Sequence, residues 1–481
     1  MIATVPSATD QASASQSPHQ ARTSRLFEEL KTEPQRLRKF LWQMPKGGDI
    51  HHHALGAIWA EDYLDTAIRK SLWIEPASYR LFFDQVDALT EGVNDALPLT
   101  ELLASQPESR EEIIDHWSVR NHKENNRDGH HWFFSTFQKF EKALIGNEPE
   151  FLSNLCEAAA RENVQYLETM IAVPSIIQRV AQLVDDKEWM PGMSVRSHLA
   201  EWYAFLEAAD IDQWASYNAE VMEHWIKNTE THGVTLRFQT LALRIMPDPD
   251  MVFAHLVLAF KTAMLSPHLV GVNLAAPEDH KVSLSDYNTH MAMFAYLKEK
   301  FPEVNIALHA GELVLGKGDC QEQDLRFHID KAVATGKAQR IGHGVDLLQE
   351  TNHSSLLKTM KAQGVAVEIN LECNEVILGT DPGSHPLKAY LAAEVPVCIC
   401  SDDPAILRSD LTHQYELLVD YLPEISYGQV KALVYNAIHY SFLGQNEKLL
   451  ELEKLNKAFE QFEAQITQHT EKRRSGTLPE A

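Results

Sequence analysis

The chain has little positive charge and no long apolar stretch. Its 481 residues include 43 Lys plus Arg against 68 Asp plus Glu, which gives a formal charge of −25. Proteins that bind polyanions need basic stripes that displace counterions, so we expect no nucleic-acid partner. No run approaches the ~18 consecutive apolar residues of a membrane span, so we expect no membrane partner either.

Cysteine is scarce, and several well-known short motifs are missing. Five Cys in a chain of this length do not form a disulfide scaffold, and they favour a reducing compartment. The N-terminus lacks a charged-then-apolar signal pattern, so we expect a cytoplasmic protein; a signal peptide removed beforehand would instead mean a periplasmic or secreted one. The sequence has no Gly-x-Gly-x-x-Gly, Walker loop or Gly-x-Ser-x-Gly elbow, which argues against the classes that use them.

Short apolar, β-branched runs alternate with longer stretches of helical periodicity, such as Leu284–Phe301 and Ser354–Gln363. Several runs are apolar almost throughout, as buried parallel strands are. The runs predicted to be strands are Gly48–Ala54, Val164–Ile171, Leu236–Leu243, Val270–Ala275, Asn305–His309, Arg340–His343, Val365–Asn370 and Val395–Ser401. Eight such alternations predict an α/β fold, a (β/α)8 TIM barrel, with an open doubly wound sheet as the alternative.

The rest of the chain is assigned around this barrel. Residues 1–24 are rich in Ser, Ala, Gln and Thr and are predicted to be a disordered leader. Residues 25–470 are predicted to form a single barrel domain, with a largely helical insertion at about 60–160 and a polar tail at 471–481. Within the insertion, Phe133, Phe134, Phe137 and Phe140 have helical spacing. We expect them to pack in a core, or to roof the active site, because insertions after barrel strands lie on the catalytic face.

Polar residues that can carry chemistry cluster at the carboxyl ends of four predicted strands. They are His51 and His53, His309 and Glu312, His343, and Asp402 and Asp403. Side chains two apart on a strand share a face, so the first two His project together. Barrel enzymes build active sites at these strand ends. Three imidazole nitrogens and one carboxylate form a ligand set that suits Zn²⁺ and leaves room for water or substrate.

These same segments resemble the signature blocks of the adenosine deaminase family, within the metal-dependent amidohydrolases. The matching blocks are Met44–His53, His309–Glu312, Arg340–Gly344 and Ser401–Pro404. The resemblance extends from about Met44 to Leu443, and it is most like the growth-factor-related branch of the family and the bacterial relatives of that branch. Cytidine-type zinc deaminases are a different class, which uses a Cys-x-x-Cys motif that this chain lacks.

The resemblance implies a role for each matching residue. One Zn²⁺ would be held by His51, His53, His309 and Asp402. Glu312 would donate a proton to a purine ring nitrogen, and His343 would assist deprotonation of the activated water and steady the resulting hydroxide. Asp403 would hydrogen-bond another ring nitrogen, and the backbone N–H of Ala276 would hold the base.

Three positions depart from the family pattern. Leu55 replaces the acidic or hydroxyl residue that contacts the sugar 5′-hydroxyl, Asn273 replaces the usual Asp, and Ala276 replaces the usual Gly. The leading hypothesis is a zinc-dependent enzyme that converts adenosine or deoxyadenosine to inosine or deoxyinosine and ammonia, with a purine nucleoside as its small-molecule partner. The alternatives are a deaminase of a 5′-modified adenosine, a methylated aminopurine or a pterin, or a non-catalytic growth-factor-like binding protein. The sequence leaves the oligomeric state open.

Overall fold

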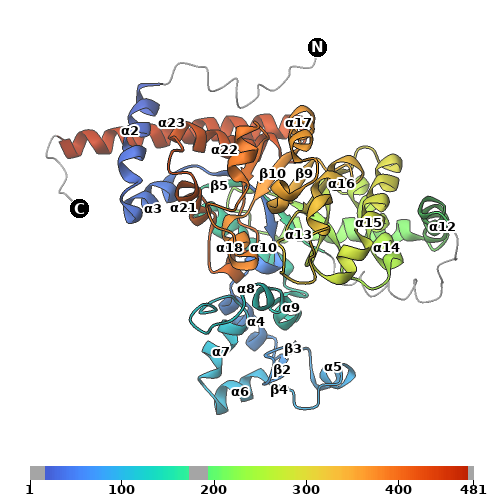
Figure 1. Cartoon of the computed structure of the whole chain (residues 1–481). Helices are drawn as coiled ribbons and strands as arrows, with labels where there is room; N and C mark the ends of the chain where they lie inside the picture. The colour runs from blue at the N-terminus through green and yellow to red at the C-terminus, as the bar shows by residue number, and fades with distance from the viewer. Residues whose placement is uncertain (1–16, 173–192, 475–481) are drawn as a thin grey trace.

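The chain is built around a closed barrel of eight parallel strands (Figure 1). The computed structural model describes residues 17–172 and 193–474. The strands follow one another around the barrel in chain order: β1 Gly47–His53, β5 Val164–Met170, β6 Thr235–Leu243, β7 Leu269–Ala275, β8 Asn305–Ala310, β9 Arg340–His343, β10 Ala366–Ile369 and β11 Val397–Ile399. The ring closes where the residues after β11 meet β1. There the His53 N–H donates to the Asp402 carbonyl at 2.8 Å, and the Asp402 N–H donates to the His51 carbonyl at 3.0 Å.

The predicted (β/α)8 barrel is therefore confirmed, and the open doubly wound sheet is wrong. Each predicted strand lies within two residues of an observed one at both ends. Strand β9 coincides with its prediction, and all four of its residues are buried. The prediction succeeds because a strand buried on both faces carries a continuous apolar run that periodicity detects.

Helices cover the outside of the barrel. Those that follow the later strands are α12 Val195–Ala208, α13 Ile211–Asn228, α14 Pro249–Leu265, α15 Lys281–Lys300, α16 His328–Ala334, α17 His353–Gln363, α18 Leu371–Leu378, α19 Leu387–Ala392, α20 Pro404–Leu407, α21 Leu411–Tyr421 and α22 Tyr427–His439. The two predicted helices given as examples correspond to α15 and α17. None of the helices in the described ranges combines the length and apolar character needed to cross a bilayer.

The segment between β1 and β5 is an insertion that projects from one end of the barrel (Figure 1). Its projecting helices are α4 Ala60–Arg69, α5 Gln85–Thr90, α6 Leu99–Ser105, α7 Ser109–His116, α8 Gly129–Phe134 and α9 Phe137–Leu144. Helix α10 Glu148–Arg161 then returns to the barrel and packs against β5. It also holds a small antiparallel sheet, β2 Trp73–Ile74, β3 Leu81–Phe82 and β4 Leu97–Pro98, which the sequence did not predict. Strands of two residues are too short to leave a periodic signal.

The aromatic stripe of the insertion is divided between two short helices. Phe133 and Phe134 lie on α8, and Phe137 and Phe140 lie on α9. Phe133 and Phe140 are buried, and the rings of Phe133 and Phe137 meet edge-on with centroids 5.4 Å apart. The stripe packs in a core, as expected. The insertion also touches the carboxyl end of the barrel, because a Cβ at Gly129 on α8 would lie 2.3 Å from the Val376 carbonyl on α18.

The ends of the chain differ from their predictions. Residues 1–16 of the predicted leader lie outside the described residues, but its last part is helical, in α2 Pro18–Leu30. Thr23 and Phe27 of this helix are buried, where α2 lies against α3 Pro34–Gln43, α22 and the long helix α23 Gln445–Arg474 (Figure 1). Polar composition suggested disorder, and packing against helices distant in sequence outweighs it. Helix α23 likewise continues through the first residues of the predicted tail.

Candidate metal centre and active site

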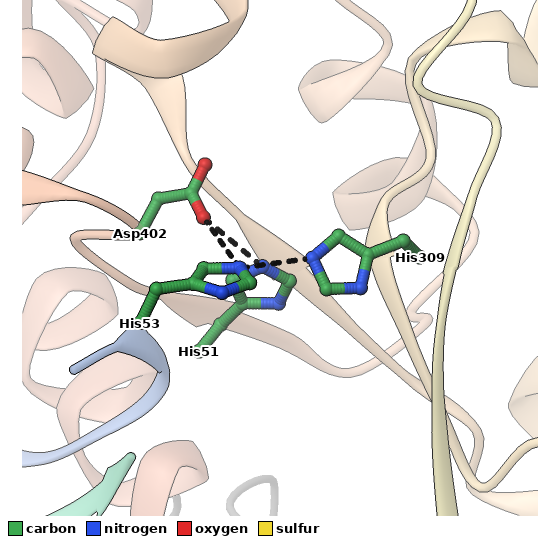
Figure 2. A group of neighbouring side chains, drawn as sticks. All are labelled: His51, His53, His309 and Asp402. Carbon is green, nitrogen blue, oxygen red and sulfur yellow. Dashed lines mark hydrogen bonds and ion pairs between the residues drawn. The ribbon is translucent and has the colours of Figure 1, made fainter. Parts of the chain in front are cut away.

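Four side chains converge at the carboxyl ends of three strands (Figure 2). His51 and His53 come from β1, His309 from β8, and Asp402 from the turn after β11. One potential ligand atom from each lies within 4.8 Å of the others. His53 Nε2 is 3.1 Å from His309 Nε2, and Asp402 Oδ1 is 3.3 Å from His51 Nε2 and 3.4 Å from His53 Nε2. The sequence-predicted ligand set is therefore brought together.

This arrangement fits a metal ion. Tetrahedral ligands with metal–ligand bonds of about 2.0–2.1 Å lie about 3.3 Å apart, close to the observed separations. His51 Nε2 is buried and finds no hydrogen-bond donor or acceptor of good geometry within the described residues. His52, between the two ligands, turns away and places its Nδ1 2.8 Å from the Thr169 hydroxyl. The alternation expected of a strand therefore separates the ligands from their neighbour.

Burial and mutual contacts set the charges of the group. Burial lowers the pKa of His53 to about 4, and burial and the charge of His51 hold the pKa of His309 well below its usual range. For His51, burial also lowers the pKa, but Asp402 and Glu368 outweigh burial and raise it to about 10. Burial opposes the charge of Asp402, yet the neighbouring histidines hold its pKa well below the usual value. These shifts favour a proton on His51 beside the Asp402 carboxylate, and a metal ion bound by the four side chains would take the place of that proton.

Glu312 and His343 lie beside this group. Glu312 follows Gly311, whose φ of +76° makes the turn that directs the glutamate into the barrel mouth. His343 Nε2 is 3.7 Å from Glu312 Oε1 and 3.9 Å from Asp402 Oδ2. Burial, reinforced by Asp402, raises the pKa of Glu312 well above its usual value, and burial lowers the pKa of His343 to about 3. Burial thus favours the protonated form of the Glu312 carboxyl and the neutral form of the His343 imidazole.

Asp403 completes the set of predicted side chains. Burial and the adjacent Asp402 raise its pKa well above the usual value. Its Oδ1 is buried and has no hydrogen-bond partner in the part of the chain that the structure describes. This oxygen lies against Gly56, where a Cβ would be 1.6 Å away. A protonated Asp403 can donate or accept a hydrogen bond at a ligand placed in the mouth.

Ala276 stands at the end of β7 with a φ of +85°. This left-handed conformation favours glycine, which explains why Gly is usual at this position in the family that the sequence resembles. The Ala276 carbonyl accepts a hydrogen bond from Arg244 Nε at 2.7 Å. Arg244 Nη1 also donates to the His309 carbonyl at 3.0 Å. The guanidinium therefore holds the strained Ala276 and links it to His309 on β8.

Three buried residues that the sequence analysis missed hold the site residues in place. Glu278 accepts the backbone N–H groups of Gly311 and Glu312 at 3.1 and 2.9 Å. Glu368 lies 2.6 Å from His51 Nδ1. Asn374 places its amide nitrogen 2.9 Å from His343 Nδ1. A charge inside an apolar strand, as in Val367-Glu368-Ile369, is the sequence signal that could have identified the second of them.

The hydrogen bonds behind His343 indicate where its proton lies. The backbone N–H of Leu387 donates to His385 Nδ1 at 3.1 Å, so neutral His385 carries its proton on Nε2. That nitrogen faces Asn374 Oδ1 at 3.2 Å, which directs the Asn374 amide N–H toward His343 Nδ1. Neutral His343 therefore presents an N–H from Nε2 toward Glu312 and Asp402.

A (β/α)8 barrel with three His and one Asp converging at its strand ends has the architecture of the metal-dependent amidohydrolases. A family model described as adenosine deaminase matches residues 121–458. The chain belongs to the adenosine deaminase family, whose members are deaminating hydrolases. The matched region contains His309, Glu312, His343 and the Asp402–Asp403 pair, while β1 precedes it.

Curated relatives match shorter segments. An adenosine deaminase of Aedes albopictus is 32% identical over 197 residues, which cover 40% of this chain and 34% of that protein. An adenine deaminase of Rhizobium leguminosarum bv. trifolii is 28% identical over 185 residues, 38% of this chain and 51% of that protein. The chain thus matches about a third to a half of the length of these relatives.

Solved structures share the fold over most of the chain. The N6-methyl-AMP deaminase of Arabidopsis thaliana matches with a TM-score of 0.55 and 19% identity, over 88% of this chain and 98% of that one. An amidohydrolase of Burkholderia ambifaria with bound Zn matches with a TM-score of 0.54 and 14% identity, over 89% and 94%. The expected place within the growth-factor-related branch stays a prediction.

Proposed function

We propose that the protein is a zinc-dependent deaminase that hydrolyses adenosine or deoxyadenosine to inosine or deoxyinosine and ammonia. The convergence of His51, His53, His309 and Asp402 beside Glu312, whose pKa burial raises, carries this proposal. The family assignment and the zinc named in the Burkholderia ambifaria relative support the reaction class and the metal. When bound, zinc lowers the pKa of a water ligand toward ~7 and so supplies a nucleophile at neutral pH.

Four residues around the proposed metal site take the other roles in the reaction. Glu312 donates its proton to the ring nitrogen next to the reacting carbon, which lets the ring accept charge as water adds. Asp403 hydrogen-bonds another ring nitrogen, and the Ala276 N–H holds the base. His343 would present its Nε2–H to the oxygen of the attacking water and hold it in place. Its hydrogen-bonding pattern supports this steadying role, whereas assisting deprotonation of the water would require an Nε2 lone pair.

A second candidate keeps the chemistry and changes the substrate to a 5′-modified or methylated aminopurine nucleoside. Leu55, at the expected sugar position, packs its side chain against the apolar core and uses its carbonyl to accept the Tyr63 hydroxyl at 2.8 Å. It offers no side-chain acceptor to a 5′-hydroxyl. The structural likeness to an N6-methyl-AMP deaminase makes a 5′-phosphate and a methylated amine reasonable probes.

A substrate panel on zinc-loaded protein tests both candidates. Adenosine, deoxyadenosine, AMP, N6-methyl-AMP, a 5′-alkylthio-adenosine, adenine and a pterin are each followed by absorbance change and ammonia release. We expect turnover of a purine nucleoside, and a loss of on the order of 10²–10⁴-fold in kcat in Glu312→Gln, which lacks the acid proton. Preference for unmodified adenosine would remove the second candidate.

Metal dependence is measured on the same samples. Chelation should abolish turnover, and added Zn²⁺ should restore it, with metal content near one ion per chain. If neither the wild type nor Glu312→Gln turns over any member of the panel, deamination is excluded. The remaining hypothesis would then be the last alternative from the sequence, a non-catalytic growth-factor-like binding protein.

A further inference from the structure

Two of the metal-ligand histidines are held from behind by different chemical groups. His51 places its Nδ1 2.6 Å from the Glu368 carboxylate, whereas His309 places its Nδ1 2.9 Å from the amide oxygen of Asn273. Asn273 is fully buried, and its Oδ1 also accepts the backbone N–H of Leu274 at 2.8 Å. A carboxylate would place a negative charge at this position, and the asparagine does not.

The orientation of the Asn273 amide is fixed by groups that cannot reverse their own polarity. Gln239 Nε2 donates to Glu168 Oε1 at 2.9 Å and to the Ile50 carbonyl at 3.2 Å, and both of these oxygens only accept. Gln239 must therefore turn its Oε1 toward Asn273, whose Nδ2 lies 3.2 Å away. Asn273 in turn must point its Oδ1 at His309.

Glu168 anchors this chain of polar side chains as a hydrogen-bond acceptor. It accepts the guanidinium N–H of Arg340, the Tyr166 hydroxyl at 2.6 Å and the Phe442 N–H at 3.2 Å in addition to Gln239. Arg340 Nε also pairs with Glu368 Oε1 at 2.6 Å. The polar chain thus runs through the barrel interior from behind His309 to behind His51, and its side chains are at most 1% exposed.

We propose that the Asn273–Gln239 amide pair is a positioning device for the metal site. It forces His309 to carry its proton on Nδ1 and so leaves the Nε2 lone pair free for the ion, while its neutral charge keeps metal affinity below that given by a carboxylate. An Asp at position 273 would place a carboxylate oxygen against Gln239 Oε1, and two acceptors cannot hydrogen-bond each other. The Asn273 amide N–H is therefore the donor that Gln239 Oε1 needs. The inference rests on the metal site of the proposed function.

The test measures the apparent dissociation constant for Zn²⁺ by competition with a chromophoric chelator at fixed pH. Asn273→Leu removes the acceptor and should weaken binding about 10–100-fold. Gln239→Leu does not touch His309, and it leaves Asn273 Oδ1 accepting the backbone N–H groups of Leu274 and His309 at 2.8 and 3.3 Å. It should therefore weaken zinc binding in the same direction but by less than Asn273→Leu does. Asn273→Asp keeps an acceptor at His309 and should bind zinc at least as tightly as the wild type.

Asn218→Leu is the matched control, since it removes a buried amide on α13 that pairs with the Thr262 hydroxyl at 3.4 Å. It should leave zinc affinity unchanged, and thermal unfolding of each metal-free variant reports whether it folds. The inference is overturned if Asn273→Leu binds like the wild type, if Asn273→Asp binds as weakly as Asn273→Leu, or if the control loses as much. A wild type that binds no zinc would instead overturn the proposed metal site itself.

Discussion

Single residues without reactive groups set the geometry of the mouth. Gly56 is the clearest case, because the Asp403 carboxylate occupies the space where any other residue would place its Cβ. Ala276 is the converse case, a residue with a Cβ in a conformation that favours glycine. At Gly56, the absence of a Cβ lets the Asp403 carboxylate lie against the backbone. At Ala276, the hydrogen bond from Arg244 to the carbonyl stabilises the strained backbone.

Gly56→Ala should therefore displace Asp403 and reduce turnover. The added methyl group would lie 1.6 Å from Asp403 Oδ1, and a displacement of about 1 Å at a reacting group can cost on the order of 10²-fold in rate. We expect a fall of that size in kcat/KM for the best substrate of the panel. Gly428→Ala is the matched control, since the nearest atom there is Ser426 Oγ at 3.9 Å. Equal activity of the two variants would show that Asp403 does not need its present position.

Among the elements, the N-terminal helix α2 shows how a polar-looking segment becomes part of the fold. Its buried face meets α3 and α22, with the Phe27 ring 5.7 Å from Phe40 and 6.1 Å from Tyr427, measured between centroids. Ser17 caps the helix by accepting the Gln20 N–H at 3.1 Å. These contacts join the first described helix to the last part of the chain.

Phe27→Ala tests the weight of this packing. Phe27 is fully buried, and removing a buried Phe side chain typically costs about 3–5 kcal/mol of unfolding free energy. Urea unfolding followed by circular dichroism should show a loss of that order. Glu29→Ala, at an exposed position of the same helix, should change stability by less than about 0.5 kcal/mol. A loss below about 1 kcal/mol for Phe27→Ala would mean that α2 docks weakly.

At the scale of the whole molecule, several acidic side chains are buried, among them Asp346 and Glu350. Beside the barrel mouth, burial raises the pKa of Glu350 to about 7 and that of Asp346 well above its usual value. Glu350 Oε1 accepts the N–H groups of Ile329 and Asp330 at 2.6 and 3.1 Å. Such acids favour the folded state only while they are protonated.

Stability should consequently fall as pH rises past neutrality. The folded-state pKa of Glu350 lies above its unfolded value, so its contribution is complete below about pH 4.5 and is lost as pH rises through about 7. Glu350→Gln removes this dependence. In metal-free protein, the free energies of unfolding of wild type and Glu350→Gln should be similar at pH 5. At pH 8, that of the variant should be larger by about 1–2 kcal/mol, a range that allows for solvent screening of the carboxylate. Parallel curves between these pH values would contradict the prediction.

Much of this molecule was open to prediction from local patterns. The eight strands, the meeting of His51, His53, His309 and Asp402, and the position of Glu312 follow from apolar runs that end in polar residues, because the strand ends of a parallel barrel meet on one face. The two-residue strands of the insertion and the helical start of α2 were missed. Their stability comes from contacts with distant segments, which leave no local period.

By itself, the sequence determined which residues could bind a metal and supply a proton, since those properties belong to side-chain type and spacing. Only the tertiary structure decided how they are held. Glu168 on β5 fixes Gln239 on β6, which fixes Asn273 on β7 and finally His309 on β8. The physical reason is that a buried amide must satisfy both its donor and its acceptor, and several of the partners that dictate its orientation lie on other strands.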